Sequence, residues 1–160
     1  MYNLEICRRA LATLIITDEL PFRFVEGEGF RKFCQVMQPK FAVPSRITIA
    51  RDCLKLYYEE KEKLNKEIKN ERICLITDCW TSIQNINYMY LTAHWIDSDW
   101  KLHKRILNFC QIPNHKGETI GKMVESCLIE YGIDKILTIT VDNASSNDGA
   151  IKYIKRRTKD

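Results

Sequence analysis

Two aspartates, each directly after a short apolar run, are the residues of this chain best placed for chemistry. Asp78 follows the run at 73–77, and Asp142 follows the run at 136–141. Both runs are rich in β-branched residues, which is typical of buried strands. If the two strands are adjacent and parallel, both carboxylates lie at one edge of the sheet, where sites form in open α/β sheets. Neighbouring carboxylates repel unless a cation or a proton lies between them, and Mg²⁺ often uses one or two carboxylates.

The order of the predicted elements brings these two strands together. The region from residue 71 contains, in order, strands at 73–77, 88–96 and 100–112, a helix between Gly117 and Gly132, a strand at 136–141 and a helix from about residue 145. The turn Asp97-Ser98-Asp99 makes the second and third strands a hairpin. The order β-β-β-α-β-α predicts an antiparallel meander followed by one right-handed crossover, which sets the fourth strand parallel to the first. The fold class predicted for residues 71–160 is therefore α/β.

Residues 1–70 read as a separate helical region. Apolar residues at helical spacing predict a first helix that Pro21 ends. A short helix is expected at 30–37, and Ser45 is suited to cap a long third helix. The apolar stripe of the first helix consists of Ile6, Ala10, Leu11, Leu14 and Ile15.

The composition excludes several classes of protein. With 45% hydrophobic and 29% charged residues among 160, the chain has the composition of a globular protein. No apolar run approaches the roughly 20 residues of a membrane span, and the first 20 residues do not resemble a signal peptide. The seven cysteines form no C-x-x-C pair, so neither a disulfide framework nor a zinc site is predicted, and a reducing compartment is expected. A net charge of +4 permits nucleic-acid binding without requiring it.

The two aspartate motifs resemble those of hAT-superfamily DNA transposases, and in particular the plant BED-zinc-finger group called RICESLEEPER-like. The segments that carry this resemblance are Thr77-Asp78-Cys79-Trp80-Thr81-Ser82 and Val141-Asp142-Asn143-Ala144-Ser145-Ser146-Asn147. The segments Leu20-Pro21-Phe22 and Phe41-Ala42-Val43-Pro44-Ser45-Arg46 also fit that group, so the likeness covers essentially the whole chain. The resemblance implies a ribonuclease H-like fold over 71–160.

The resemblance also implies a chemistry. Three acids in that family bind divalent metal and catalyse DNA hydrolysis and strand transfer, and Asp78 and Asp142 match the first two. The implied cofactor is Mg²⁺ or Mn²⁺. The family's BED zinc finger has no counterpart here, and its fifth strand and catalytic glutamate would follow Asp160. The resemblance therefore implies an incomplete ribonuclease H-like domain, ancestrally a DDE-type enzyme and inactive as this chain.

Further expectations concern partners and location. A basic cluster at the C-terminus could contact DNA phosphates weakly and without sequence preference. Its members are Lys152, Lys155, Arg156, Arg157 and Lys159. The simpler interpretation is a charged helix end whose cations complement the helix dipole. An unpaired edge on the strand at 136–141 predicts self-association. The expected location is the nucleus, with the cytosol as the alternative.

Other interpretations stay open at this stage. Asp78 could be a turn residue, and Asp142 could cap the last helix. His94 and His103 lie on strand patterns and His115 in a loop. The chain could be a domesticated, non-catalytic DNA-binding or protein-interaction module. A Mg²⁺-dependent phosphatase-like domain is a third interpretation, but no nucleophile motif or phosphate-binding glycine loop supports it.

Overall fold

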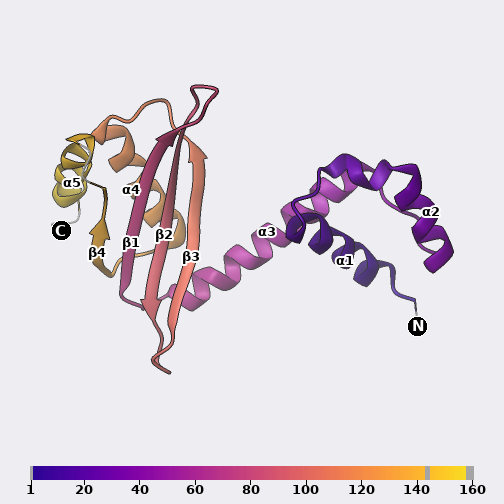
Figure 1. Ribbon diagram of the computed structural model, residues 1–160. Helices are drawn as coiled ribbons and strands as arrows, with labels where there is room; N and C mark the ends of the chain where they lie inside the picture. Colours follow the sequence, from indigo (N-terminus) through magenta and orange to yellow (C-terminus); the bar gives the residue numbers. More distant parts are fainter. Residues whose placement is uncertain (1, 143–144, 158–160) are drawn as a thin grey trace. The chain divides into compact units, whose positions relative to one another are not determined.

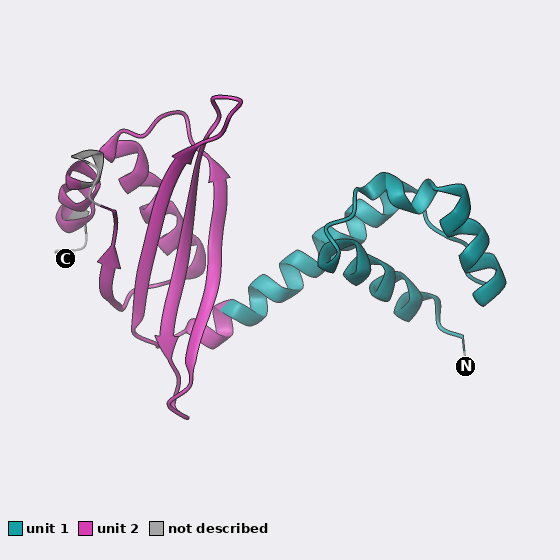
Figure 2. Cartoon of the chain, in the orientation of Figure 1, with its two compact units in different colours: residues 1–64 teal, residues 65–160 magenta. Residues whose placement is uncertain are grey.

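The chain contains two compact units, which are residues 1–64 (unit 1) and 65–160 (unit 2) (Figure 2). The computed structural model describes residues 2–142 and 145–157, with the backbone alone at 145–147 and 157. Within this described part, no helix combines the length and the apolar character that a membrane crossing requires.

Unit 1 is helical, as predicted. Its elements are α1 (Leu4–Thr17), the 3₁₀ helix η1 (Phe22–Glu26), α2 (Glu28–Met37) and α3 (Arg46–Ile68), which continues into unit 2. Ser45 caps α3 as expected, since its Oγ lies 3.3 Å from the backbone N of Thr48 and accepts its hydrogen. The core of unit 1 consists of Leu11, Ala12, Ile15, Val25, Ile49, Cys53 and Leu56.

One expectation about α1 is wrong, and another holds only in part, since Leu11 and Ile15 of the predicted stripe are buried. The helix ends at Thr17, before Pro21, because the chain turns at Glu19 with a φ of 51°; Pro21 instead precedes η1. The buried face of α1 is formed by Leu11, Ala12 and Ile15, and Ile6 is 66% exposed. An amphipathic pattern shows which side of a helix is apolar, but it does not show how much of that side is covered by neighbouring elements.

Unit 2 has the predicted topology (Figure 1). Its elements are β1 (Ile73–Thr81), β2 (Asn87–Ile96), β3 (Leu102–Gln111), α4 (Gly117–Tyr131), β4 (Ile136–Thr140) and α5 (Ser145–Arg157). The sheet order is β3-β2-β1-β4, with β4 parallel to β1 and the other two pairings antiparallel. Gly132 ends α4 in the left-handed conformation, with a φ of 63°, as its position predicted.

The two faces of this sheet differ. Side chains alternate between the faces of a strand, and Ile73, Leu75 and Thr77 of β1 are buried on the face toward α4. The hydroxyl of Tyr131 in α4 donates to the carbonyl of Leu107 at 2.9 Å, which ties the helix to β3. Among the described residues of unit 2, no helix lies over the opposite face, which is toward the viewer in Figure 1.

Helix α5 packs on α4 through close glycine contacts. A Cβ atom on Gly149 would lie 3.3 Å from the Cα of Gly117, so the two backbones approach closely where these residues meet. One turn further along α4, Gly121 faces the ring of Tyr153. The Tyr153 hydroxyl donates to Glu125 at 2.7 Å. These contacts hold in place the helix that follows Asp142.

Candidate two-aspartate site

Asp78 lies within β1 and not after it. The expectation that the strand ends at residue 77 is wrong, because β1 runs on to Thr81 by pairing with β2. Asp78 is paired with Tyr90, and its half-buried carboxylate accepts the backbone N–H of Cys79 at 2.8 Å. On the other side of β1, however, the pairing with β4 ends at Ile76, two residues before Asp78. Asp78 therefore lies at the carboxyl edge of the parallel strand pair.

Asp142 reaches the same level of the sheet. The parallel register pairs Leu75 with Ile139 and Ile76 with Thr140. Continued by two residues, this register sets Asp78 beside Asp142, and neighbouring strands lie about 4.8 Å apart. Asp142 is an exposed residue two positions after the end of β4, which stops at Thr140 and not at residue 141 as predicted.

The charges of both carboxylates raise the pKa of the Cys79 thiol. Burial raises its pKa first, and the charges of Asp78, Asp142 and then the neighbouring Cys110 add to this, so that the pKa of the Cys79 thiol reaches about 11. A thiolate here would be repelled by both aspartates. The pKa of one thiol is thus raised by two aspartates that are 64 positions apart in the sequence, which agrees with the strand register.

The pair of carboxylates suits a hard divalent cation. Mg²⁺ prefers oxygen ligands and keeps several waters, so two carboxylates at a partly open edge match its needs. Across the described residues, no group of three His, Cys, Asp or Glu side chains is placed to hold a metal ion. The candidate site therefore offers two protein ligands, Asp78 and Asp142, both oxygen donors.

An aromatic cluster beside Asp78 was missed from the sequence. Trp80, Tyr88, Tyr90 and Phe109 place their rings in mutual contact, with centroids 5.5–6.0 Å apart. The strand alternation shows that Trp80 shares a face with Asp78, but only the register of β2 and β3 adds Tyr88, Tyr90 and Phe109.

His115 was placed in a loop by the sequence, and its hydrogen bonds were not foreseen. Its Nε2 lies 3.2 Å from the hydroxyl of Thr81 and 3.0 Å from Oδ1 of Asn87. Because the Thr81 hydroxyl donates to Asn87 Oδ1 at 2.8 Å, both partners act as acceptors and Nε2 carries the proton. This network joins the loop before α4 to the ends of β1 and β2.

The other two histidines lie on the hairpin. The Nε2 of His103 lies 2.5 Å from a carboxylate oxygen of Asp97, within hydrogen-bond distance, and the ring of His103 stacks on Trp95 at 5.0 Å. His94 pairs with Cys74 across the sheet, and its Nε2 is buried with no hydrogen-bond partner among the residues that the structure describes. Neither residue belongs to the edge that bears Asp78 and Asp142.

The predicted basic cluster lies on α5. Lys152, Lys155 and Arg156 are exposed, so phosphates could reach them. The side chain of Arg157 and the whole of Lys159 lie outside the described residues. Arg156 also bonds the carbonyl of Lys152 at 3.3 Å, as expected of a helix end.

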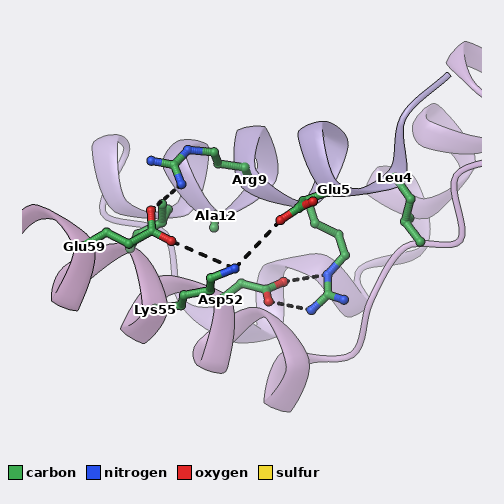
Figure 3. Close-up of a pocket in the computed structure, with 9 residues that line it drawn as sticks. Leu4, Glu5, Arg9, Ala12, Asp52, Lys55 and Glu59 are labelled. Atoms are coloured by element: carbon green, nitrogen blue, oxygen red, sulfur yellow. Dashed lines mark hydrogen bonds and ion pairs between the residues drawn. The ribbon is translucent and has the colours of Figure 1, made fainter. Parts of the chain in front are cut away.

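A second charged surface, in unit 1, has a structural role (Figure 3). A groove of about 510 Å³ runs between α1 and α3, and its charges pair with one another. Arg8 binds Asp52 through two nitrogens, and Arg9 binds Glu59 at 2.5 Å. Lys55 lies 3.8 Å from Glu5. Since these charges are matched within the groove, they join two helices and leave no surplus for a charged ligand.

Comparisons with known proteins agree with this geometry. The family model described as the ZBED1 RNase-like domain matches residues 76–160. The putative AC transposase of Zea mays is 37% identical over 157 residues, which is 96% of this chain and 20% of that protein. The zinc finger BED domain-containing protein DAYSLEEPER of Arabidopsis thaliana is 34% identical over 158 residues, covering 96% of this chain and 23% of the relative.

A rice relative gives the same result. The zinc finger BED domain-containing protein RICESLEEPER 2 of Oryza sativa subsp. japonica is 34% identical over 143 residues, which is 86% of this chain and 20% of that protein. The chain thus spans about a fifth of the length of these relatives. No solved structure gives a significant match. The four-stranded mixed sheet with its helices fits the ribonuclease H-like fold of the matched domain, and the chain belongs to the ZBED1 RNase-like domain family of hAT-transposase-related proteins.

Proposed function

We propose that this chain supplies two metal-binding acids, Asp78 and Asp142, of a DNA transposase of the hAT type. The observation that carries the proposal is the register of β1 and β4, which brings both aspartates to one edge of the sheet. The relatives of this chain include a putative transposase, and we therefore infer that the substrate is DNA. The cation is Mg²⁺ or Mn²⁺, because the donors are carboxylate oxygens.

The residues of the chain act by holding two negative charges close together. The N–H of Cys79 orients the carboxylate of Asp78, and α5, the helix that follows Asp142 in the chain, packs on α4. A divalent cation bound there supplies Lewis-acid activation of a phosphoryl oxygen. Without it, the two carboxylates repel each other, so they favour a state in which a positive charge lies between them.

We infer that the chain alone does not cut DNA. Metal-assisted phosphoryl transfer commonly uses a clamp on both the attacking and the leaving oxygen. The described residues offer two acids and no third ligand at this edge. The same observation favours the second candidate function, a non-catalytic DNA-binding or protein-interaction module that keeps the fold and the acid pair.

We further infer weak DNA contact through α5 and a nuclear location, with the cytosol as the alternative. Lys152, Lys155 and Arg156 are exposed on one helix, and such contacts bind phosphates regardless of base sequence. Each phosphate contact releases counterions, so binding should fall steeply as salt rises.

Two assays on the purified chain test these proposals. Calorimetry with Mg²⁺ should give weak binding that Asp78→Asn and Asp142→Asn each abolish, whereas Asp148→Asn, an exposed acid in the first turn of α5, should bind as wild type does. Supercoiled plasmid incubated with Mg²⁺ or Mn²⁺ should stay intact. Nicking that Asp78→Asn removes would refute the claim of inactivity, and Mg²⁺ binding that survives both Asn variants would refute the site.

A further inference from the structure

The face of the sheet that bears Asp78 carries a row of aromatic rings. Tyr90 of β2 is paired with Asp78 on one side and with Phe109 of β3 on the other. In the next row toward the end of β1, Trp80 is paired with Tyr88. Since cross-strand partners share a face, the acid and the four rings lie on the same surface.

The rings form one continuous cluster. The Trp80 ring stacks on Tyr88 at 5.6 Å and contacts Phe109 at 5.5 Å, and Tyr88 stacks on Phe109 at 5.7 Å. Phe109 is nevertheless 60% exposed, and the other three rings are half-buried. Among the described residues of unit 2, no helix lies over this face of the sheet. The cluster is therefore partly exposed, with Phe109 as its most exposed ring, and it lies directly beside Asp78.

The character of this face changes along its length. Away from Asp78 it carries aliphatic side chains, among them Ile106 at 64% and Leu102 at 66% exposure. The four rings that contact one another gather at the end that bears the aspartates. An apolar segment of protein would fill both ends equally well, whereas nucleobases stack on aromatic faces with a preference that aliphatic side chains do not match.

We propose that Trp80, Tyr88, Tyr90 and Phe109 form a stacking surface for unpaired nucleobases of single-stranded or locally opened DNA. The proposal rests on the proposed function, since the phosphates of such a strand would lie beside the aspartate pair and its cation. Duplex DNA is the poorer ligand, because its bases are already stacked on one another and expose only their edges. The surface reads no particular sequence, because every base has a π face.

The test uses the complete chain and an oligothymidylate of about eight nucleotides, a length within the range that single-strand binding surfaces cover. Binding is measured by fluorescence anisotropy with Mg²⁺ and again with EDTA. Quenching of Trp80 is followed in a Trp100→Phe background, since Trp100 is 85% exposed at the far end of the sheet. Phe109→Ala and Phe109→Leu remove the ring, and Ile106→Ala is the matched control on the same strand and face, with similar exposure.

We expect Phe109→Ala to weaken oligothymidylate binding about 5- to 150-fold, which is the range for loss of one stacking ring. Phe109→Leu keeps an apolar side chain and should lose a similar factor, whereas Ile106→Ala should bind as wild type does. Wild-type affinity in Phe109→Leu, or no binding by the wild type, would overturn the proposal. Equal weakening in Ile106→Ala would also overturn it, because the aromatic ring would then contribute no more to DNA binding than an aliphatic side chain does.

The outcome is separable from that of the proposed function. A Phe109 effect in EDTA, together with no Mg²⁺ binding by the wild type, would support the stacking surface and refute the metal site. Mg²⁺ binding that depends on Asp78, with identical oligothymidylate affinity in all ring variants, would support the metal site and refute the stacking surface.

Discussion

Gly121→Ala tests how closely α5 is held against α4. A Cβ atom added to Gly121 would lie 2.7 Å from Cδ1, 2.9 Å from Cγ and 3.0 Å from Cβ of Tyr153. Carbon atoms in ordinary contact are about 3.5–4.0 Å apart. The contacted atoms lie at the root of the Tyr153 side chain, so the ring cannot swing aside and the helix itself must move by about 1 Å.

The cost follows from three contributions. Overpacking of this kind costs about 1–3 kcal/mol. Loss of the bond from the Tyr153 hydroxyl to Glu125 would add about 1–2 kcal/mol, and replacing glycine by alanine within a helix returns about 1 kcal/mol. We expect Gly121→Ala to destabilise unit 2 by about 1–4 kcal/mol in all.

Urea unfolding followed by tryptophan fluorescence measures this change in unit 2 alone, because all three tryptophans lie between residues 65 and 160. In a Tyr153→Ala background the two closest contacts are gone and only the 3.0 Å contact with Cβ remains, so the cost of Gly121→Ala should fall by about 1–3 kcal/mol. Tyr153→Phe separates the hydrogen bond from the clash. A Gly121→Ala effect of the same sign and size in both backgrounds would refute the reasoning.

Three further predictions concern an ion pair, a turn and an edge. Arg8→Ala should lower the stability of unit 1 by about 1 kcal/mol, because the contact of Arg8 with Asp52 through two nitrogens joins α1 to α3. Thermal melts followed by far-UV circular dichroism check this, with Arg8→Lys and high salt as the comparisons. Hydrogen bonding to His103 lowers the pKa of Asp97 below its ordinary 3.8. The ionised carboxylate therefore stabilises the fold fully above pH 3.8, and this contribution is lost as the pH falls through the lowered pKa. Urea midpoints should accordingly differ between wild type and Asp97→Asn above pH 3.8 and converge below the lowered pKa. Leu137→Lys on the edge strand β4 should reduce self-association in sedimentation experiments, since Leu137 is 59% exposed there, and a monomeric wild type at high concentration would contradict this.

The sheet topology could be predicted because several local signals agreed. The alternation in β2, the turn at Asp97 and the glycine at residue 132 each marked an element boundary that the structure confirms. The crossover rule then left one place for β4, beside β1. The closeness of Asp78 and Asp142 in register depends only on these features.

Other features depend on pairing that the sequence does not contain. The first strand was expected to end at residue 77, but pairing of Trp80 with Tyr88 and of Thr81 with Asn87 extends β1 to Thr81. A register shift between Leu91 and Thr92 sets Phe109 opposite Tyr90 and so completes the aromatic cluster. One residue of slip would have turned Phe109 to the other face of the sheet.

The most direct test of the account is a paramagnetic Mn²⁺ titration of the chain, followed by NMR. Bound Mn²⁺ broadens the amide signals around it, so the affected residues locate the ion. We expect broadening centred on residues 78 and 142, lost in Asp78→Asn and in Asp142→Asn and retained in Asp148→Asn. Broadening centred elsewhere, or unchanged in both Asn variants at the site, would contradict the claim that these two aspartates hold the cation.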